Sequence, residues 1–360
     1  FGVSEELQYD ILLLININSI FKMKKAKFYK TNQDGSLRCL LCNHYCVIKN
    51  KQTGICLNRI NDNGNLYTLD YGVVSAQNID PIEKKPFFHF MPGSLTYSIG
   101  SLGCNFKCDN CQNYEISQIK SIKKILDNFD NINPERIVEE AIGNDCQAIA
   151  YTYNEPTINI EYYIDIMRIA QANGLKNLWV SNGYMSDECL KEIFPYVDAI
   201  NIDLKSFDDN FYNNICSAKL TPVLNNLKKI KQEQIHLEVT TLIIPGLSDD
   251  IKTLSQIADF LSQELDSDTP WHLSKFSPDI SWKLKNIPST GEDVIYQAYE
   301  IAKDAGLKYV YVGNIPGDQK ENTYCPRCGE LAIRRLGYHI ERLDQNGCCA
   351  QCDRSLDIVE

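Results

Sequence analysis

Eleven of the 15 cysteines in this sequence fall into three groups whose spacing is typical of metal ligands. The groups are Cys39, Cys42, Cys46 and Cys56; Cys104, Cys108 and Cys111; and Cys325, Cys328, Cys349 and Cys352. Closely spaced thiols in a long chain indicate metal binding rather than a disulfide framework, and they remain reduced in the cytoplasm. We therefore predict a cytoplasmic metalloprotein.

The second group has the spacing Cys-x3-Cys-x2-Cys, from Cys104 to Cys111. Three thiolates this close can ligate three irons of a four-iron, four-sulfur cluster and leave the fourth iron without a protein ligand. An iron with an open coordination position is a reaction site, so we predict that Cys104, Cys108 and Cys111 are catalytic. The alternatives are an incomplete zinc site or a fourth ligand from a distant part of the chain.

The third group consists of two Cys-x2-Cys pairs with 20 residues between them, which is the spacing of a zinc ribbon. Four protein ligands close the coordination sphere, so this zinc site is expected to be structural. Cys348 is an alternative ligand. Residues 319–360 carry six Lys or Arg and seven Asp or Glu, which favours a protein contact over nucleic acid.

The first group, which has His44 inside it, has ligands for one metal centre. Its spacing does not decide between zinc and a second iron–sulfur cluster, and zinc is slightly favoured. The remaining cysteines, Cys146, Cys189 and Cys216, are expected to be small buried apolar residues.

The elements that must position these groups alternate along the middle of the chain. Runs rich in Val, Ile, Tyr and Thr predict strands: 95–99, 148–153, 177–182, 199–205, 236–245, 271–276 and 309–313. Apolar residues three and four apart predict helices: 134–143, 160–173, 249–265 and 292–305. Such alternation indicates a parallel sheet, open or closed as a barrel, whose chemistry lies at the carboxyl ends of its strands.

Composition narrows the class further. The formal net charge of −11 argues against nucleic acid as a partner. The apolar run 11–15 is far shorter than the roughly 20 residues that span a bilayer, so no membrane segment is expected. Met23 begins a natural-looking start, and we interpret residues 1–22 as a non-native upstream extension. The predicted domains are a Cys-rich segment, 23–62, a barrel domain, 63–318, and the ribbon, 319–360.

Several further motifs resemble a known family, the AmmeMemoRadiSam system radical SAM enzyme, which is itself similar to pyruvate formate-lyase activating enzymes. The residues that carry the resemblance are the cysteine triad, Asp80–Pro86, His89–Ser94, Cys111–Asn113, Tyr151–Pro156, Asp203–Lys205 and Thr323–Pro326. The resemblance implies an α/β fold, a partial (β/α)6 radical SAM barrel. It also implies reductive cleavage of S-adenosylmethionine (SAM) at the 4Fe–4S cluster to a 5′-deoxyadenosyl radical, which abstracts hydrogen from a substrate.

The same resemblance implies an electron donor such as flavodoxin or ferredoxin, and a substrate that is either a protein, through a backbone glycine, or a small molecule. The alternative function is an iron–sulfur electron-transfer or zinc scaffold protein without SAM chemistry. A triad with an open iron favours the enzyme, because an electron carrier is better served by four ligands.

The resemblance also implies which residues contact SAM. Glu155 corresponds to the carboxylate that meets the methionine ammonium, and Asp203 and Lys205 correspond to a contact with the methionine moiety. His272 corresponds to a histidine near the cofactor. Ser181 and Asn182 end the third strand and are candidates for ribose or carboxylate binding. Each assignment has an alternative. Glu155 can be a solvated glutamate at a helix start, and Asp203 and Lys205 can form a buried ion pair. His272 can be a core histidine, and Ser181 and Asn182 can belong to a turn.

One position departs from the superfamily pattern. An aromatic residue usually precedes the third cysteine and lies against the adenine, but this chain has Asn110 there. Phe106 or Tyr114 are the candidates to supply a ring instead, although either can simply be a core residue.

Overall fold

The computed structural model describes residues 23–360, so the predicted upstream extension lies outside the described residues. Its centre is an eight-stranded sheet with the strand order β14-β13-β12-β11-β10-β9-β8-β7. Strands β8 to β14 are parallel, and only β7 runs antiparallel, against β8. The strand bounds are β7 Ala76–Pro81, β8 Leu95–Gly100, β9 Ala148–Tyr151, β10 Lys176–Ser181, β11 Ala199–Asp203, β12 His236–Ile243, β13 Trp271–Lys275 and β14 Val310–Gly313. The parallel α/β sheet that the sequence predicts is therefore confirmed.

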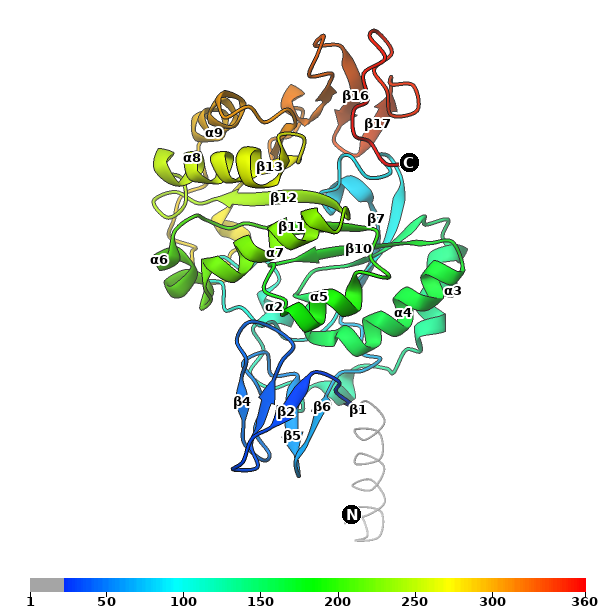
Figure 1. Ribbon diagram of the computed structural model, residues 1–360, viewed down its shortest axis with the longest axis vertical. Helices are drawn as coiled ribbons and strands as arrows, with labels where there is room; N and C mark the ends of the chain where they lie inside the picture. Colours follow the sequence, from blue (N-terminus) through cyan, green and yellow to red (C-terminus); the bar gives the residue numbers. More distant parts are fainter. Residues whose placement is uncertain (1–22) are drawn as a thin grey trace, which may run out of the picture.

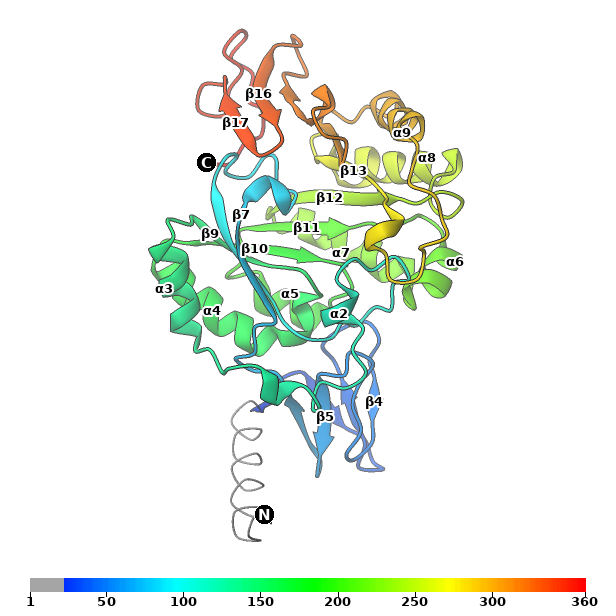
Figure 2. The ribbon, with the colours of Figure 1, turned by 180° about the vertical axis from the view of Figure 1, so that it is seen from behind.

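Helices cover one face of this sheet, as the two opposite views show (Figures 1 and 2). The α-helices are α2 Tyr114–Ser117, α3 Pro134–Gly143, α4 Ile160–Ala172, α5 Asp187–Ile193, α6 Asp209–Phe211, α7 Leu220–Gln232, α8 Ile251–Asp259 and α9 Glu292–Asp304. Two π-helical turns, η4 Tyr212–Cys216 and η5 Phe260–Asp266, extend α6 and α8. The short 3-10 turns are η1 Ile82–Lys84, η2 Leu126–Asn128, η3 Pro156–Asn159, η6 Pro278–Ile280 and η7 Gln319–Glu321.

Alternation along the strands explains this layering. Side chains two apart point to the same face of a strand, so Ile200 and Ile202 of β11 join the large core beneath the helices, while Ala199 belongs to a second core. Phe87 and Phe90, which precede β8, fill that second core on the inner face of the sheet. The inner face is thus packed from the segment between β7 and β8.

The Cys-rich segment, together with the following residues up to Thr68, forms two small antiparallel sheets, with the orders β1-β6-β5 and β2-β3-β4. Their strands are β1 Lys24–Lys25, β2 Tyr29–Thr31, β3 Leu37–Cys39, β4 Val47–Ile48, β5 Arg59–Asp62 and β6 Asn65–Thr68. The strands are short, and loops carry three of the four cysteines. A rigid fold here therefore depends on what the cysteines bind and on packing against the barrel.

The C-terminal segment is a three-stranded antiparallel sheet of β15 Thr323–Tyr324, β16 Leu331–Leu336 and β17 His339–Arg342. It lies at the opposite end of the molecule from the N-terminal sheets (Figure 1). Arg335 donates to the carbonyl oxygen of Phe88, and the ring of His89 contacts the Leu356 carbonyl oxygen and the Tyr311 hydroxyl. Burial lowers the pKa of His89 to about 3, so the imidazole is neutral in this interface. These contacts attach the C-terminal segment to the amino ends of the barrel strands.

The described part of the chain has no helix that is long and apolar enough to cross a membrane. The proposed domain limits at residues 62 and 318 stay predictions.

Candidate active site and metal centres

The loop that carries Cys104, Cys108 and Cys111 follows β8 at the carboxyl edge of the parallel sheet. Asn154 holds its start, because the Asn154 side chain accepts from the Ser101 amide at 3.0 Å and donates to the Gly103 carbonyl oxygen at 2.8 Å. Asn113 holds its end by donating to the Tyr153 carbonyl oxygen at 2.7 Å. Both ends of the cysteine loop are therefore hydrogen-bonded to the segment that follows β9.

The middle of the cysteine loop is held from the opposite side. The amides of Lys107 and Asp109 donate to the carbonyl oxygens of Cys216 and Ile215, at 2.9 and 3.0 Å. Both acceptors belong to the π-helical turn η4, a rare geometry that is frequent at functional sites. The cysteine loop therefore bridges the segments that follow β9 and β11.

The three thiols of the loop are largely withdrawn from solvent, and Cys108 is buried. The pKa of Cys108 is raised well above its usual range, first by a hydrogen bond with Cys216 and then by burial. Burial raises the pKa of Cys104 and Cys111. Because buried thiolates need a positive partner, and because these three come from one loop, the donor set fits an iron–sulfur cluster.

Glu155, Ser181 and Asn182, which the sequence singled out separately, meet at one point. The buried Glu155 carboxylate accepts from the Ser181 hydroxyl and the Asn182 amide, both at 2.8 Å, and from Thr157. Burial raises the pKa of Glu155 despite these donors. Cys104 is close enough to interact electrostatically with this carboxylate.

Asp203 and Lys205 form an ion pair of 2.8 Å at the carboxyl end of β11. Burial acts to lower the pKa of Lys205, but the Asp203 carboxylate, Cys108 and Cys216 outweigh it and hold the pKa well above its usual range. The ammonium group is therefore charged. The Lys205 amide donates to the Tyr212 hydroxyl in η4, the turn that also binds the cysteine loop.

Two candidate cofactor contacts, His272 and Phe106, lie outside the site. His272 is the second residue of β13, away from the carboxyl end, and its Nε2 lies 2.6 Å from a Glu238 oxygen while its ring stacks on Tyr311. The structure therefore places it in the buried network beneath the C-terminal sheet, apart from the other site residues. Phe106 is 1% exposed and packs on Tyr184 and Tyr212, so its ring belongs to the core.

The C-terminal cysteines form a compact tetrad. The sulfur atoms of Cys325 and Cys352 lie 3.6 Å apart, those of Cys328 and Cys349 lie 3.5 Å apart, and all four are within 4.8 Å of one another. This geometry is compatible with one tetrahedral metal ion. Cys348 is not a member of the tetrad.

Sequence reasoning missed three residues of the site. Cys216, expected to be an inert core residue, raises the pKa of Cys108, and its carbonyl oxygen accepts from the Lys107 amide in the cysteine loop. Asn154 anchors the cysteine loop, and Asn105 accepts from Asn182 through its side chain and contacts His44 Nε2 through its carbonyl oxygen. The motif around Glu155 contained a signal for Asn154, whereas Cys216 has no neighbouring motif.

Comparisons with known proteins agree with this geometry. The model of the radical SAM superfamily matches residues 98–261. An uncharacterized protein of Methanocaldococcus jannaschii is 44% identical over 340 residues, 94% of this chain and 100% of that protein. A second protein of that organism, provisionally named a glycyl-radical enzyme activating enzyme, is 28% identical and covers 60% of this chain and 76% of its own length. The pyruvate formate-lyase-activating enzyme of Staphylococcus epidermidis is 23% identical, over 62% of this chain and 92% of its own.

A parallel α/β sheet with a three-cysteine loop at its carboxyl edge defines an iron–sulfur enzyme of the SAM-dependent radical type. The chain belongs to the radical SAM superfamily, with activating enzymes among its relatives. The narrower resemblance to the AmmeMemoRadiSam system stays a prediction.

Proposed function

We propose that this protein reductively cleaves SAM and abstracts a hydrogen atom from a substrate of the activating-enzyme type, a protein. A 4Fe–4S cluster held by Cys104, Cys108 and Cys111 would supply the electron that splits SAM into methionine and a 5′-deoxyadenosyl radical. The observation that carries the proposal is that Glu155 and Lys205 follow the two segments that bind the cysteine loop: Glu155 follows Asn154, which anchors the start of the loop, and the Lys205 amide donates to the Tyr212 hydroxyl in η4, which binds its middle.

The methionine end of SAM is a zwitterion, so an ammonium group and a carboxylate on the protein can each bind one of its two charges. The Lys205 ammonium complements the carboxylate of SAM, and Asp203 orients it. The Glu155 carboxylate complements the ammonium of SAM. The Ser181 hydroxyl, which donates to Glu155, also lies 3.1 Å from the sulfur of Met185. It therefore has a second hydrogen-bond partner when the ammonium of SAM replaces it at Glu155. Charge-assisted hydrogen bonds of this kind are strong where water is excluded.

The relatives' names, which describe enzymes that activate other enzymes, support a protein substrate. We also propose a separate electron donor, of the flavodoxin or ferredoxin class. We further propose that the C-terminal tetrad holds one structural zinc ion, and that the protein works in a reducing compartment, the cytoplasm. All 15 cysteines are free in the described residues, which supports that location.

The decisive experiment is anaerobic reconstitution with iron and sulfide, followed by incubation with SAM and dithionite. We expect 5′-deoxyadenosine and methionine as products, measured by mass spectrometry. The Cys108→Ala variant should release neither, while Cys146→Ala, which changes a buried cysteine outside the site, should match the wild type. Absence of 5′-deoxyadenosine from a wild-type protein that carries its cluster would overturn the proposal.

A further inference from the structure

All four N-terminal cysteines line one small cavity at the junction of the Cys-rich segment and the barrel. The other lining residues include His44, Arg59 and Asn105. Cys39 ends β3, and Cys42, Cys46 and Cys56 lie in the turns around β4 and before β5. Side chains that are distributed over 18 residues of sequence thus converge on one space.

Local backbone geometry supports a built site. Tyr45, which precedes Cys46, has a φ of 46°, and Leu57, which follows Cys56, has a φ of 66°. Non-glycine residues adopt this left-handed region at a cost, and such strain is concentrated at functional sites. The Tyr45 amide donates to the Cys42 carbonyl oxygen and the Cys39 amide to that of Cys46, which fixes the turns that present the thiols.

The separation of the thiols distinguishes a single ion from a cluster. Zn–S bonds of about 2.3 Å place the sulfurs of a zinc tetrahedron about 3.8 Å apart. The C-terminal tetrad has this compactness, with all four ligand atoms within 4.8 Å of one another. Among residues 23–360 it is the only group of three or more ligand atoms gathered in this way, and neither the N-terminal thiols nor the catalytic triad form such a group. Wider spacing is expected when each thiolate binds a different iron of a cluster, because the inorganic core lies between them.

Two residues that line the cavity each have a buried hydrogen-bond donor without a partner. Asn105 Nδ2 and Arg59 Nε are both buried, and neither has a hydrogen-bond partner among the described residues. A buried donor without a partner is costly, and the sulfur atoms of a cluster are acceptors for such groups. The other nitrogens of the Arg59 guanidinium bind Glu161 and the Ile158 carbonyl oxygen, which leaves Nε as its unpartnered donor.

We propose that Cys39, Cys42, Cys46 and Cys56 hold a second iron–sulfur cluster. Its four protein ligands leave no open iron, so this cluster binds no SAM and its chemistry is one-electron exchange. It lies directly behind the catalytic loop. A Cβ atom on Gly103 would approach the Cys56 carbonyl oxygen to 2.4 Å, and Asn105, between Cys104 and Phe106, belongs to both sites. The proposal does not depend on SAM cleavage.

The test uses the full chain without its catalytic ligands, as the variant Cys104→Ala/Cys108→Ala/Cys111→Ala, reconstituted anaerobically with iron and sulfide. We expect about two to four irons per chain with equal sulfide, and a paramagnetic signal after dithionite reduction that SAM does not alter. Adding Cys39→Ser and Cys42→Ser should remove this iron, whereas adding Cys146→Ser should not. A chain that holds about two zinc ions and no iron would overturn the proposal.

A second measurement keeps the test decisive if the triple variant does not fold. In the chain with its triad intact, Cys39→Ser/Cys42→Ser should lower the iron content by about two to four while the SAM-sensitive signal of the catalytic cluster remains. Unchanged iron would contradict a second cluster. A wild-type protein that holds both clusters but cleaves no SAM would instead refute only the proposed function.

Discussion

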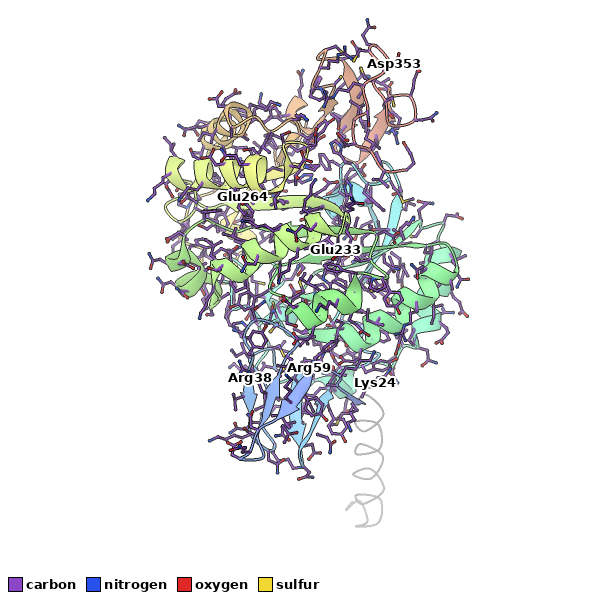
Figure 3. The ribbon with its side chains drawn as sticks, viewed as in Figure 1. Lys24, Arg38, Arg59, Glu233, Glu264 and Asp353 are labelled. Carbon is purple, nitrogen blue, oxygen red and sulfur yellow. The ribbon has the colours of Figure 1, made fainter. Side chains whose placement is uncertain are left out.

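The guanidinium group of Arg59 and the carboxylate of Glu161 form a two-pronged ion pair across the junction between the N-terminal sheets and the barrel. Its two N···O distances are 2.8 and 2.7 Å, and each side chain is 1% exposed. Arg59 comes from β5 and lies at this junction (Figure 3), whereas Glu161 belongs to the first turn of α4. The pair thus connects the second metal centre that we propose with the helix that follows Glu155.

Replacing one partner of this pair should destabilise the protein strongly. Arg59→Met or Glu161→Gln leaves an uncompensated buried charge, which typically costs about 3–5 kcal/mol of unfolding free energy. The double variant should lose much less than the sum of the two single losses. Denaturant unfolding of the four proteins, followed by circular dichroism, measures this coupling.

The exposed pair Lys228–Glu264 provides the control for this cycle. Its N···O distance of 2.7 Å is as short, but both side chains are more than one-third exposed. Lys228→Met should therefore cost no more than about 1 kcal/mol. Additive losses in the Arg59 and Glu161 double variant would show that the ion pair is not the connection between the two parts.

Changing Cys216 should alter the catalytic cluster without removing it. The Cys216 thiol raises the pKa of Cys108, and the turn η4 that contains it binds the cysteine loop through backbone hydrogen bonds. A thiol at this position is a candidate donor to the cluster sulfurs, and such hydrogen bonds stabilise the reduced state. Cys216→Ala should lower the reduction potential on the order of tens of millivolts, given that 59 mV is a tenfold change for one electron. A redox titration followed by electron paramagnetic resonance measures the shift.

Cys216→Ser, which keeps a hydrogen-bond donor, should recover most of that potential. Iron content should equal that of the wild type in both variants, because the three ligands are intact. Loss of the cluster in Cys216→Ala would show instead that Cys216 is a ligand.

The two outer metal centres should be separable by their metal content. Cys325→Ser/Cys328→Ser removes half of the C-terminal tetrad, so we expect the loss of about one zinc per chain with no change in iron. Elemental analysis of anaerobically purified protein tests this. A fall in iron would show that the tetrad holds a cluster.

Local sequence patterns predicted the elements whose structure depends on local chemistry. Helix α3 spans the predicted 134–143, because Pro134 fits a first helical turn and Ile137, Val138 and Ala141 line one buried face. Helix α7 lies between the predicted strands 199–205 and 236–245, where the alternation indicates a helix, but its bounds were not predicted, since Thr221 and Pro222 in its first turn are typical of a loop. Strand β7 was missed as well, because its exposed polar residues give no buried alternation at the sheet edge.

The site residues likewise separate into those that a short motif predicts and those that only the tertiary structure brings together. Spacing predicts the cysteine ligands, and the resemblance predicts Glu155 and Lys205, because both signals are contained in short segments. Cys216 lies more than 100 residues from Cys108, and only the packing of η4 on the cysteine loop brings the two together. The predicted strand 271–276 already places His272 near its amino end, and only the resemblance suggested a position near the cofactor.

The final prediction concerns how the protein binds SAM. Unpaired charges are costly in a site withdrawn from water, so the two charged ends of the methionine moiety each need a partner, which we assign to Glu155 and Lys205. Glu155→Ala or Lys205→Ala should leave the absorption spectrum of the cluster unchanged and weaken SAM binding by about 1.5–3 kcal/mol, the range for hydrogen bonds to charged groups. Affinity then falls about 10- to 150-fold. Titration of the reduced cluster with SAM, followed by electron paramagnetic resonance, measures it.

Lys176→Ala is the matched control for this titration, since Lys176 also pairs with an aspartate, Asp198 at 3.0 Å, but at the amino end of β10. Its SAM affinity should equal that of the wild type, because the amino ends of the strands lie away from the cysteine loop. If the Glu155 and Lys205 variants also bind SAM with wild-type affinity, both residues are structural and other groups bind the cofactor. A loss in the Lys205 variant alone would assign the carboxylate of SAM to Lys205 and leave Glu155 as the residue that holds Ser181 and Asn182 in place.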